Sequence, residues 1–128
     1  MLALASIAQG ASTSASKVYV AANGCAGSSY KPTKVTLACA DANLYASGLK
    51  YSSYGSSSAN ATGTIHYNTC TPNCAAGKFK SQAGSVSFSA VVSCSDGRRY
   101  FSSARYRYGK TSGTADIKPL SCGKKKKT

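Results

Sequence analysis

Residues 85–94 of the chain read SVSFSAVVSC, and this stretch decides the fold. One side of it, taken as an extended chain, is apolar: Val86, Phe88, Ala90, Val92 and Cys94. The other side carries serines and is interrupted only by Val91. Alternation with period two is typical of a strand with one face on a core and the other toward solvent. We therefore expect a half-buried strand here.

Other segments repeat the alternation, and short turn signals separate them. The expected strands are residues 35–39, 49–51, 61–67 and 100–108, with 18–21 and 117–120 as possible edge strands. Asp96-Gly97 is the best candidate for a tight hairpin, and Ala83-Gly84 and Ser112-Gly113 are further expected turns. No helical period is sustained. The pattern predicts an all-β fold, a small antiparallel β-sandwich or barrel.

Six cysteines and few large apolar residues indicate a disulfide-stabilised fold. The 128 residues include no Trp and only 3 Phe, so nine Tyr supply most of the aromatic bulk. A core this lean needs covalent support, and an even number of cysteines is typical of a disulfide framework in an oxidising compartment. The expected location is therefore outside the cell.

The pairing of the cysteines stays open in sequence, because six cysteines allow about 15 connectivities. Our working expectation is Cys25–Cys39, Cys70–Cys74 and Cys94–Cys122. The competing interpretation is a zinc site with His66, Cys70 and Cys74 as ligands at four-residue spacing. Thiolates persist poorly under oxidising conditions, so we expect neither a metal nor another cofactor.

The two ends of the chain differ from its middle. Residues 1–15 resemble the end of a secretory signal, with an apolar run and a small-x-small site at Thr13-Ser14-Ala15, although no basic residue precedes the run. A flexible Ser/Ala-rich leader on a non-secreted protein is the alternative. We expect a single β domain over residues 16–122, a lysine-rich tail over 123–128 and no transmembrane segment.

Positive charge dominates, with 16 Lys and Arg against 3 Asp and no Glu. The expected binding residues for an anionic partner are Arg98, Arg99, Arg105, Arg107, Lys124, Lys125, Lys126 and Lys127. In a strand, Arg99, Arg105 and Arg107 would share one side and the neighbouring tyrosines the other. The competing interpretation is that the tyrosines fill the core, the arginines form a solvated face, and the charge serves only solubility.

Candidates for catalysis are few. His66 and Asp41 could act as base and acid, but no serine of the chain lies in a Gly-x-Ser-x-Gly motif. The sequence has three Asp and no Glu, and so small a supply of carboxylates argues against the carboxylate pair of a glycosidase. Asp41 also suits a turn, where Asp commonly bonds its own backbone. We therefore expect no enzymatic activity and no catalytic residue.

Three blocks of sequence resemble a group of small secreted actinobacterial proteins of unknown function. The blocks are LACADAN at residues 37–43, GLKYSSYG at 48–55 and NTCTPNCAAG at 68–77. Tyr51 and Tyr54 stand where that group usually has tryptophan, and Cys94, Cys122 and the lysine tail look like additions. The resemblance implies export and a small β fold, and the two added cysteines as partners. It implies no catalytic residue.

These observations predict a secreted, non-enzymatic binding module for anionic polymers or surfaces, such as cell wall, polysaccharide or nucleic acid. One alternative is a secreted antimicrobial protein or enzyme inhibitor. Another is a self-assembling surface protein. The oligomeric state is not predicted.

Overall fold

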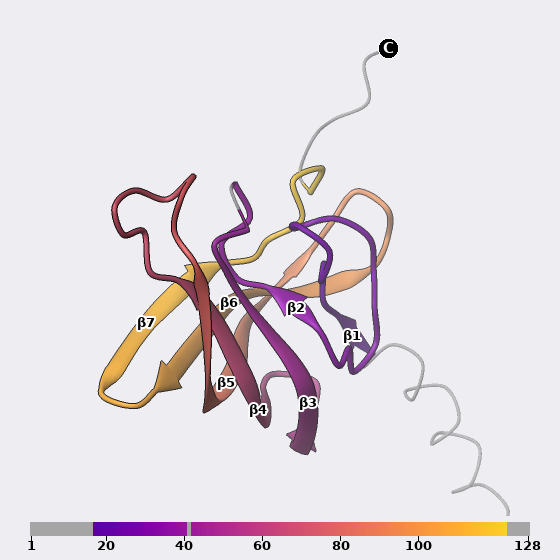
Figure 1. Ribbon diagram of the computed structural model, residues 1–128. Helices are drawn as coiled ribbons and strands as arrows, with labels where there is room; N and C mark the ends of the chain where they lie inside the picture. Colours follow the sequence, from indigo (N-terminus) through magenta and orange to yellow (C-terminus); the bar gives the residue numbers. More distant parts are fainter. Residues whose placement is uncertain (1–16, 41, 123–128) are drawn as a thin grey trace, which may run out of the picture.

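The computed structural model describes residues 17–40 and 42–122, which contain seven strands (Figure 1). The strands are β1 (Val18–Tyr19), β2 (Val35–Thr36), β3 (Leu44–Tyr54), β4 (Ala59–Asn68), β5 (Phe79–Ser93), β6 (Arg99–Tyr108) and β7 (Thr111–Asp116). Within this part of the chain no helix has the length and hydrophobicity needed to cross a membrane. The expected signal segment and lysine tail lie outside the described residues.

All seven strands belong to one sheet in the order β1-β6-β5-β4-β3-β2, with β7 also paired to β6. The sheet curls into an open half-barrel (Figure 1). The all-β prediction is confirmed, but the sheet is mixed rather than purely antiparallel. The exception is β1, which pairs in parallel with β6 through Val18 and Arg99.

Apolar side chains on the inner face of the curl form the core. The largest fully buried ones include Ile65, Val86, Phe88, Phe101 and Ile117. Four tyrosines pack against this cluster: Tyr51, Tyr54, Tyr106 and Tyr108. Because the chain has few other large apolar residues, tyrosines fill part of the core. This agrees with the interpretation in which the tyrosines are core residues.

Disulfides join Cys25 to Cys39, Cys70 to Cys74 and Cys94 to Cys122, which are the three expected pairs. The last ties the end of β5 to the segment that follows β7. Because Cys70 and Cys74 are bonded to each other, they cannot supply the thiolates that the zinc interpretation required.

The alternation that predicted β5 changes side at Ala90. This residue has a φ of 60° and is exposed, whereas Val91 packs against the core. On the partner strand, Phe101 and Ala104 are both buried although they lie three residues apart. The expected inward position of Ala90 is therefore wrong, and the apparent interruption at Val91 marks the reversal.

Two expected turns lie inside strands. Ala83-Gly84 is part of β5, which begins at Phe79, and Ser112-Gly113 is part of β7. The chain turns instead at Gly109 and Lys110, between paired Tyr108 and Thr111, and Gly109 takes a φ of 55°. The final edge strand is therefore β7, and not the expected 117–120. The Asp96-Gly97 hairpin is confirmed between β5 and β6.

An irregularity in β3 positions Lys50. Ser47 pairs with Thr64 and Lys50 pairs with Thr62, so two residues of β3 lie opposite Gly63 alone. A β-carbon at Gly63 would lie 2.6 Å from the carbonyl oxygen of Ser47, so only glycine fits beneath this bulge. The extra residue lets Leu49 enter the core and returns Lys50 to the outside.

Candidate functional site

The side of β3–β7 that faces away from the core is exposed to solvent, and we call this side the outer face. Pairing between strands aligns one set of its side chains in a line across the sheet, here named the basic row: Lys50, Thr62, Ser85, Arg107 and Ser112. Directly paired residues on one face have β-carbons about 5 Å apart. A ligand lying across the strands could therefore contact several members of the row.

The next set of outward side chains runs parallel to the basic row: Ser53, Asn60, Ser87, Arg105 and Thr114. The Ser87 hydroxyl donates to Asn60 Oδ1 at 2.7 Å, and Asn60 Nδ2 donates to Ser53 Oγ at 3.0 Å. These bonds hold the amide and hydroxyls in place, so the second row presents an ordered polar surface next to Arg105.

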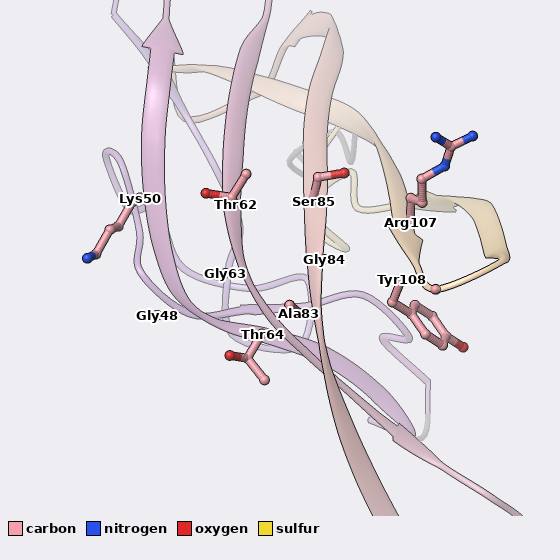
Figure 2. Close-up of a pocket in the computed structure, with 11 residues that line it drawn as sticks. Gly48, Lys50, Thr62, Gly63, Thr64, Ala83, Gly84, Ser85, Arg107 and Tyr108 are labelled. Atoms are coloured by element: carbon pink, nitrogen blue, oxygen red, sulfur yellow. The ribbon is translucent and has the colours of Figure 1, made fainter.

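A shallow hollow of about 690 Å³ lies over the basic row. Figure 2 shows Lys50 on one side of it and Arg107 on the other, with Thr62 and Ser85 between them. Gly63 and Gly84 lie in the same hollow and bring no side chain to it. The result is an open depression with a cation at each side and hydroxyls between.

A second hollow of about 440 Å³ adjoins the first, and both are lined by Ser85 and Arg107. It also contains Ser87 and Arg105. The two hollows therefore form one continuous depression from β3 toward β7, which suits an extended ligand better than a compact one.

Arg105 and Arg107 have exposed side chains with no described hydrogen bond or ion pair to neutralise them. Among residues 17–40 and 42–122, the ion pair within 4.0 Å joins Arg98 and Asp96 instead. Asp116, on β7, accepts a hydrogen bond from the backbone of Lys118. The depression consequently carries uncompensated positive charge that an anion could meet.

The four arginines expected to act together are separated by the fold. The guanidinium carbon of Arg98 lies 5.6 Å from the ring centroid of Tyr19, and its Nη1 lies 3.8 Å from Asp96 Oδ2. Arg99 is half-buried, and its Nε is buried without a hydrogen-bond partner. The reversal of faces in β6 explains why Arg99 does not follow Arg105 and Arg107 to the outer face. Lys124–Lys127 lie outside the described residues.

Asp96 is engaged in its own loop and is not available to the outer face. The Tyr100 hydroxyl donates to its carboxylate, and the backbone nitrogen of Arg98 donates to Oδ1 at 2.8 Å. These two hydrogen bonds, the first above all, lower the pKa of Asp96. The carboxylate therefore stays ionised and fixes the hairpin between β5 and β6.

Sequence reasoning missed Lys50, because its place beside Thr62 depends on the bulge in β3. It also missed a cluster around Tyr30, which is 43% exposed and has its ring centroid 5.0 Å from that of Tyr54 at the end of β3. The Lys17 and Lys31 ammonium nitrogens lie 4.8 and 5.5 Å from the centroid of the Tyr30 ring. The signal for this cluster was the neighbouring Tyr30-Lys31 pair in the sequence.

His66 has a hydrogen-bonded neighbour but no described carboxylate partner. Its Nε2 is 2.7 Å from Ser47 Oγ, and its ring stacks on Tyr45 with centroids 4.4 Å apart. Asp41 lies outside the described residues. The described carboxylates bond elsewhere, Asp96 to Tyr100 and Asp116 to the backbone of Lys118. Within residues 17–40 and 42–122, the contact between Ser47 and His66 therefore has no carboxylate of the kind that orients the base in a hydrolytic triad.

Comparison of the chain with known protein families found no match, and neither did comparison with curated proteins or with solved structures. The resemblance to small secreted actinobacterial proteins thus stays a prediction.

Proposed function

We propose that this protein is a secreted, non-enzymatic module that binds anionic polymers through its outer face. The observation that carries the proposal is the continuous depression in which Arg105, Arg107 and Lys50 have no described acidic partner. Arginine offers several directed donors to carboxylate, sulfate or phosphate groups, and the hydroxyls between the cations add neutral hydrogen bonds.

The shape of the depression favours a polymer over a small anion. Two adjoining shallow hollows leave most of a small ligand in water, whereas pockets for small ligands usually enclose them. A polymer can contact the two arginines and Lys50 at once, and each contact releases counterions. The three disulfides support a site of action outside the reducing cytosol.

The proposal is tested by measuring binding to heparin and to a DNA duplex at several salt concentrations. We expect affinity to fall steeply with salt in the parent protein, as charge contacts require. Substitution R105S/R107S should weaken binding. It should also reduce the slope of log affinity against log salt by about two, because each arginine neutralises one anionic group of the polymer.

The matched control is K17S/K31S, which removes two positive charges from the Tyr30 cluster and leaves the outer face intact. If both double variants lose affinity equally, net charge and not the outer face carries binding, and the proposal is wrong. A variant lacking residues 123–128 measures the share of the lysine tail. Binding that depends on the tail alone would also contradict the proposal.

A further inference from the structure

Beyond the basic row, the outer face carries a cluster of rings that the proposed function does not use. Tyr45 and Phe79 have ring centroids 5.9 Å apart, and Tyr45 stacks on His66 at an angle of 10°. Pairing places Tyr45 beside His66, and Phe79 beside Asn68, so the rings stand on the same face. We call these three residues the aromatic cluster.

Tyr45 and His66 already have contacts within the protein, whereas the ring of Phe79 is exposed to solvent. The Lys34 ammonium nitrogen lies 5.1 Å from the Tyr45 centroid, and Ser47 holds His66 through the 2.7 Å hydrogen bond. Phe79 is 48% exposed, although a ring of this size is usually buried. The cluster thus supports an exposed flat apolar surface with a cation close by.

The aromatic cluster and the basic row lie along the same strand. His66 and Thr62 are four residues apart on β4, which corresponds to about 13 Å along a strand. Thr64 lies between them on the same face and lines the hollow over the basic row. One extended ligand could therefore reach from Phe79 to Arg107.

The surface between these points favours a sugar polymer over a nucleic acid. It offers hydroxyls, from Thr64, Thr62 and Ser85, that suit a ligand rich in hydroxyl groups. Single-stranded nucleic acid usually needs a series of exposed rings for successive bases. The tyrosines nearest the arginines, Tyr106 and Tyr108, are half-buried and pack against the core, so they offer no such series.

We propose that the polymer is a polysaccharide bearing carboxylate or sulfate groups, with one sugar ring lying against Phe79. The apolar face of a pyranose ring would cover the exposed ring, and its acidic group would meet Lys34. Neighbouring units would place hydroxyls on Thr62 and Ser85 and a further acidic group on Arg107. This inference rests on the proposed function, because it requires the outer face to be the binding surface.

The test compares an oligogalacturonate with a single-stranded oligothymidylate of equal charge, by calorimetric titration of the oxidised protein. Phe79→Leu keeps an apolar contact to Tyr45 but removes the flat ring. We expect it to weaken oligogalacturonate binding about tenfold and to leave oligothymidylate binding unchanged. Phe79→Tyr keeps a flat ring and should bind oligogalacturonate with the affinity of the parent protein. Leu120→Ala removes another exposed apolar side chain, at 65% exposure, and should have no effect.

The outcomes separate this inference from the proposed function. If R105S/R107S weakens binding of the oligosaccharide but Phe79→Leu does not, the sugar-stacking inference fails and the outer face still binds anions. If Phe79→Leu weakens binding of both ligands equally, or if the parent protein binds oligothymidylate more tightly than oligogalacturonate, the outer face does not select polysaccharides and the inference is wrong. If R105S/R107S changes neither ligand, the proposed function itself fails.

Discussion

The hydroxyl of Tyr54, at the end of β3, donates a hydrogen bond of 2.7 Å to the carbonyl oxygen of Val18 in β1. Three strands separate β3 from β1 in the order of the sheet, so the bond spans the open side of the curl. Tyr51 donates a second hydrogen bond of 2.7 Å to the carbonyl oxygen of Pro32, just before β2, the strand that pairs with β3. Two tyrosines thus fasten the N-terminal segment over the core.

Removing the Tyr54 hydroxyl should destabilise the protein modestly at neutral pH. In Tyr54→Phe the ring still packs, but the Val18 carbonyl loses its donor. Removal of a hydrogen bond of this kind costs about 1 kcal/mol in the free energy of unfolding. Urea unfolding at pH 7 checks this, with Tyr30→Phe as a control at an exposed ring. An unchanged midpoint would show that the bond contributes nothing.

The same tyrosines predict a loss of stability in alkali. Burial raises the pKa of Tyr54 to about 12 from the ordinary 10.0, and burial raises the pKa of Tyr51 as well. The unfolded chain therefore ionises first, and the stabilisation present below pH 10 declines as the pH rises toward 12. Y51F/Y54F should flatten the decline in urea unfolding midpoint across this range. A variant that declines as steeply as the parent would contradict the assignment.

The disulfides should differ in how much they stabilise the fold. Cys94–Cys122 spans 28 residues and Cys70–Cys74 spans 4. In the chain-entropy model these correspond to about 3–4 and about 2 kcal/mol. C94S/C122S should therefore lower the free energy of unfolding more than C70S/C74S does, as measured by denaturant titration. The reverse order would show that local contacts of the small loop outweigh chain entropy.

Gly63→Ala tests the bulge beneath Lys50. The new β-carbon would meet the backbone of Ser47 and Gly48, which cannot rotate away as a side chain would. We expect a loss of about 1–3 kcal/mol in the free energy of unfolding. Gly55→Ala is the matched control, since its β-carbon would lie 3.6 Å from the nearest atom. Equal stability of the two variants would mean that the backbone of β3 leaves room for a β-carbon at residue 63.

The contact between Ser47 and His66 should be structural. His66 is stacked on Tyr45, and none of the described carboxylates orients it. We expect hydrolysis of p-nitrophenyl acetate by the parent protein to equal that by Ser47→Ala and by His66→Gln. A rate that falls in both variants would contradict the proposal that the protein is not an enzyme.

Much of the fold followed from period-two alternation, because inward positions such as Val86, Phe88 and Ile65 are separated by single polar residues. The alternation failed where backbone geometry changed. Ala90 reverses the side of β5, and Gly48 and Leu49 form the bulge of β3. Ala90 gives no sequence signal, since alanine is common in regular strands. Gly48, with a φ of 60°, is a signal for the bulge that went unrecognised in the sequence.

The candidate site was only partly predictable, because its members come from different strands. Arg105 and Arg107 were expected on one side of a strand, and their exposure follows from the inward packing of Tyr106 and Tyr108, which alternate with them. Lys50, Phe79 and Tyr45 joined the outer face only once the pairing of β3, β4 and β5 was known. Ala83-Gly84, read as a turn, concealed the first part of β5 and with it the strand position of Phe79.

The parallel pairing of β1 with β6 has a consequence for the order of assembly. Val18 meets Arg99, so the first strand lacks its neighbour until about 80 further residues have been added. The hairpins from β3 to β7 can form locally as the chain emerges, whereas the N-terminal strand must wait. We therefore expect the pairing of β1 with β6 to be a late, long-range step of folding.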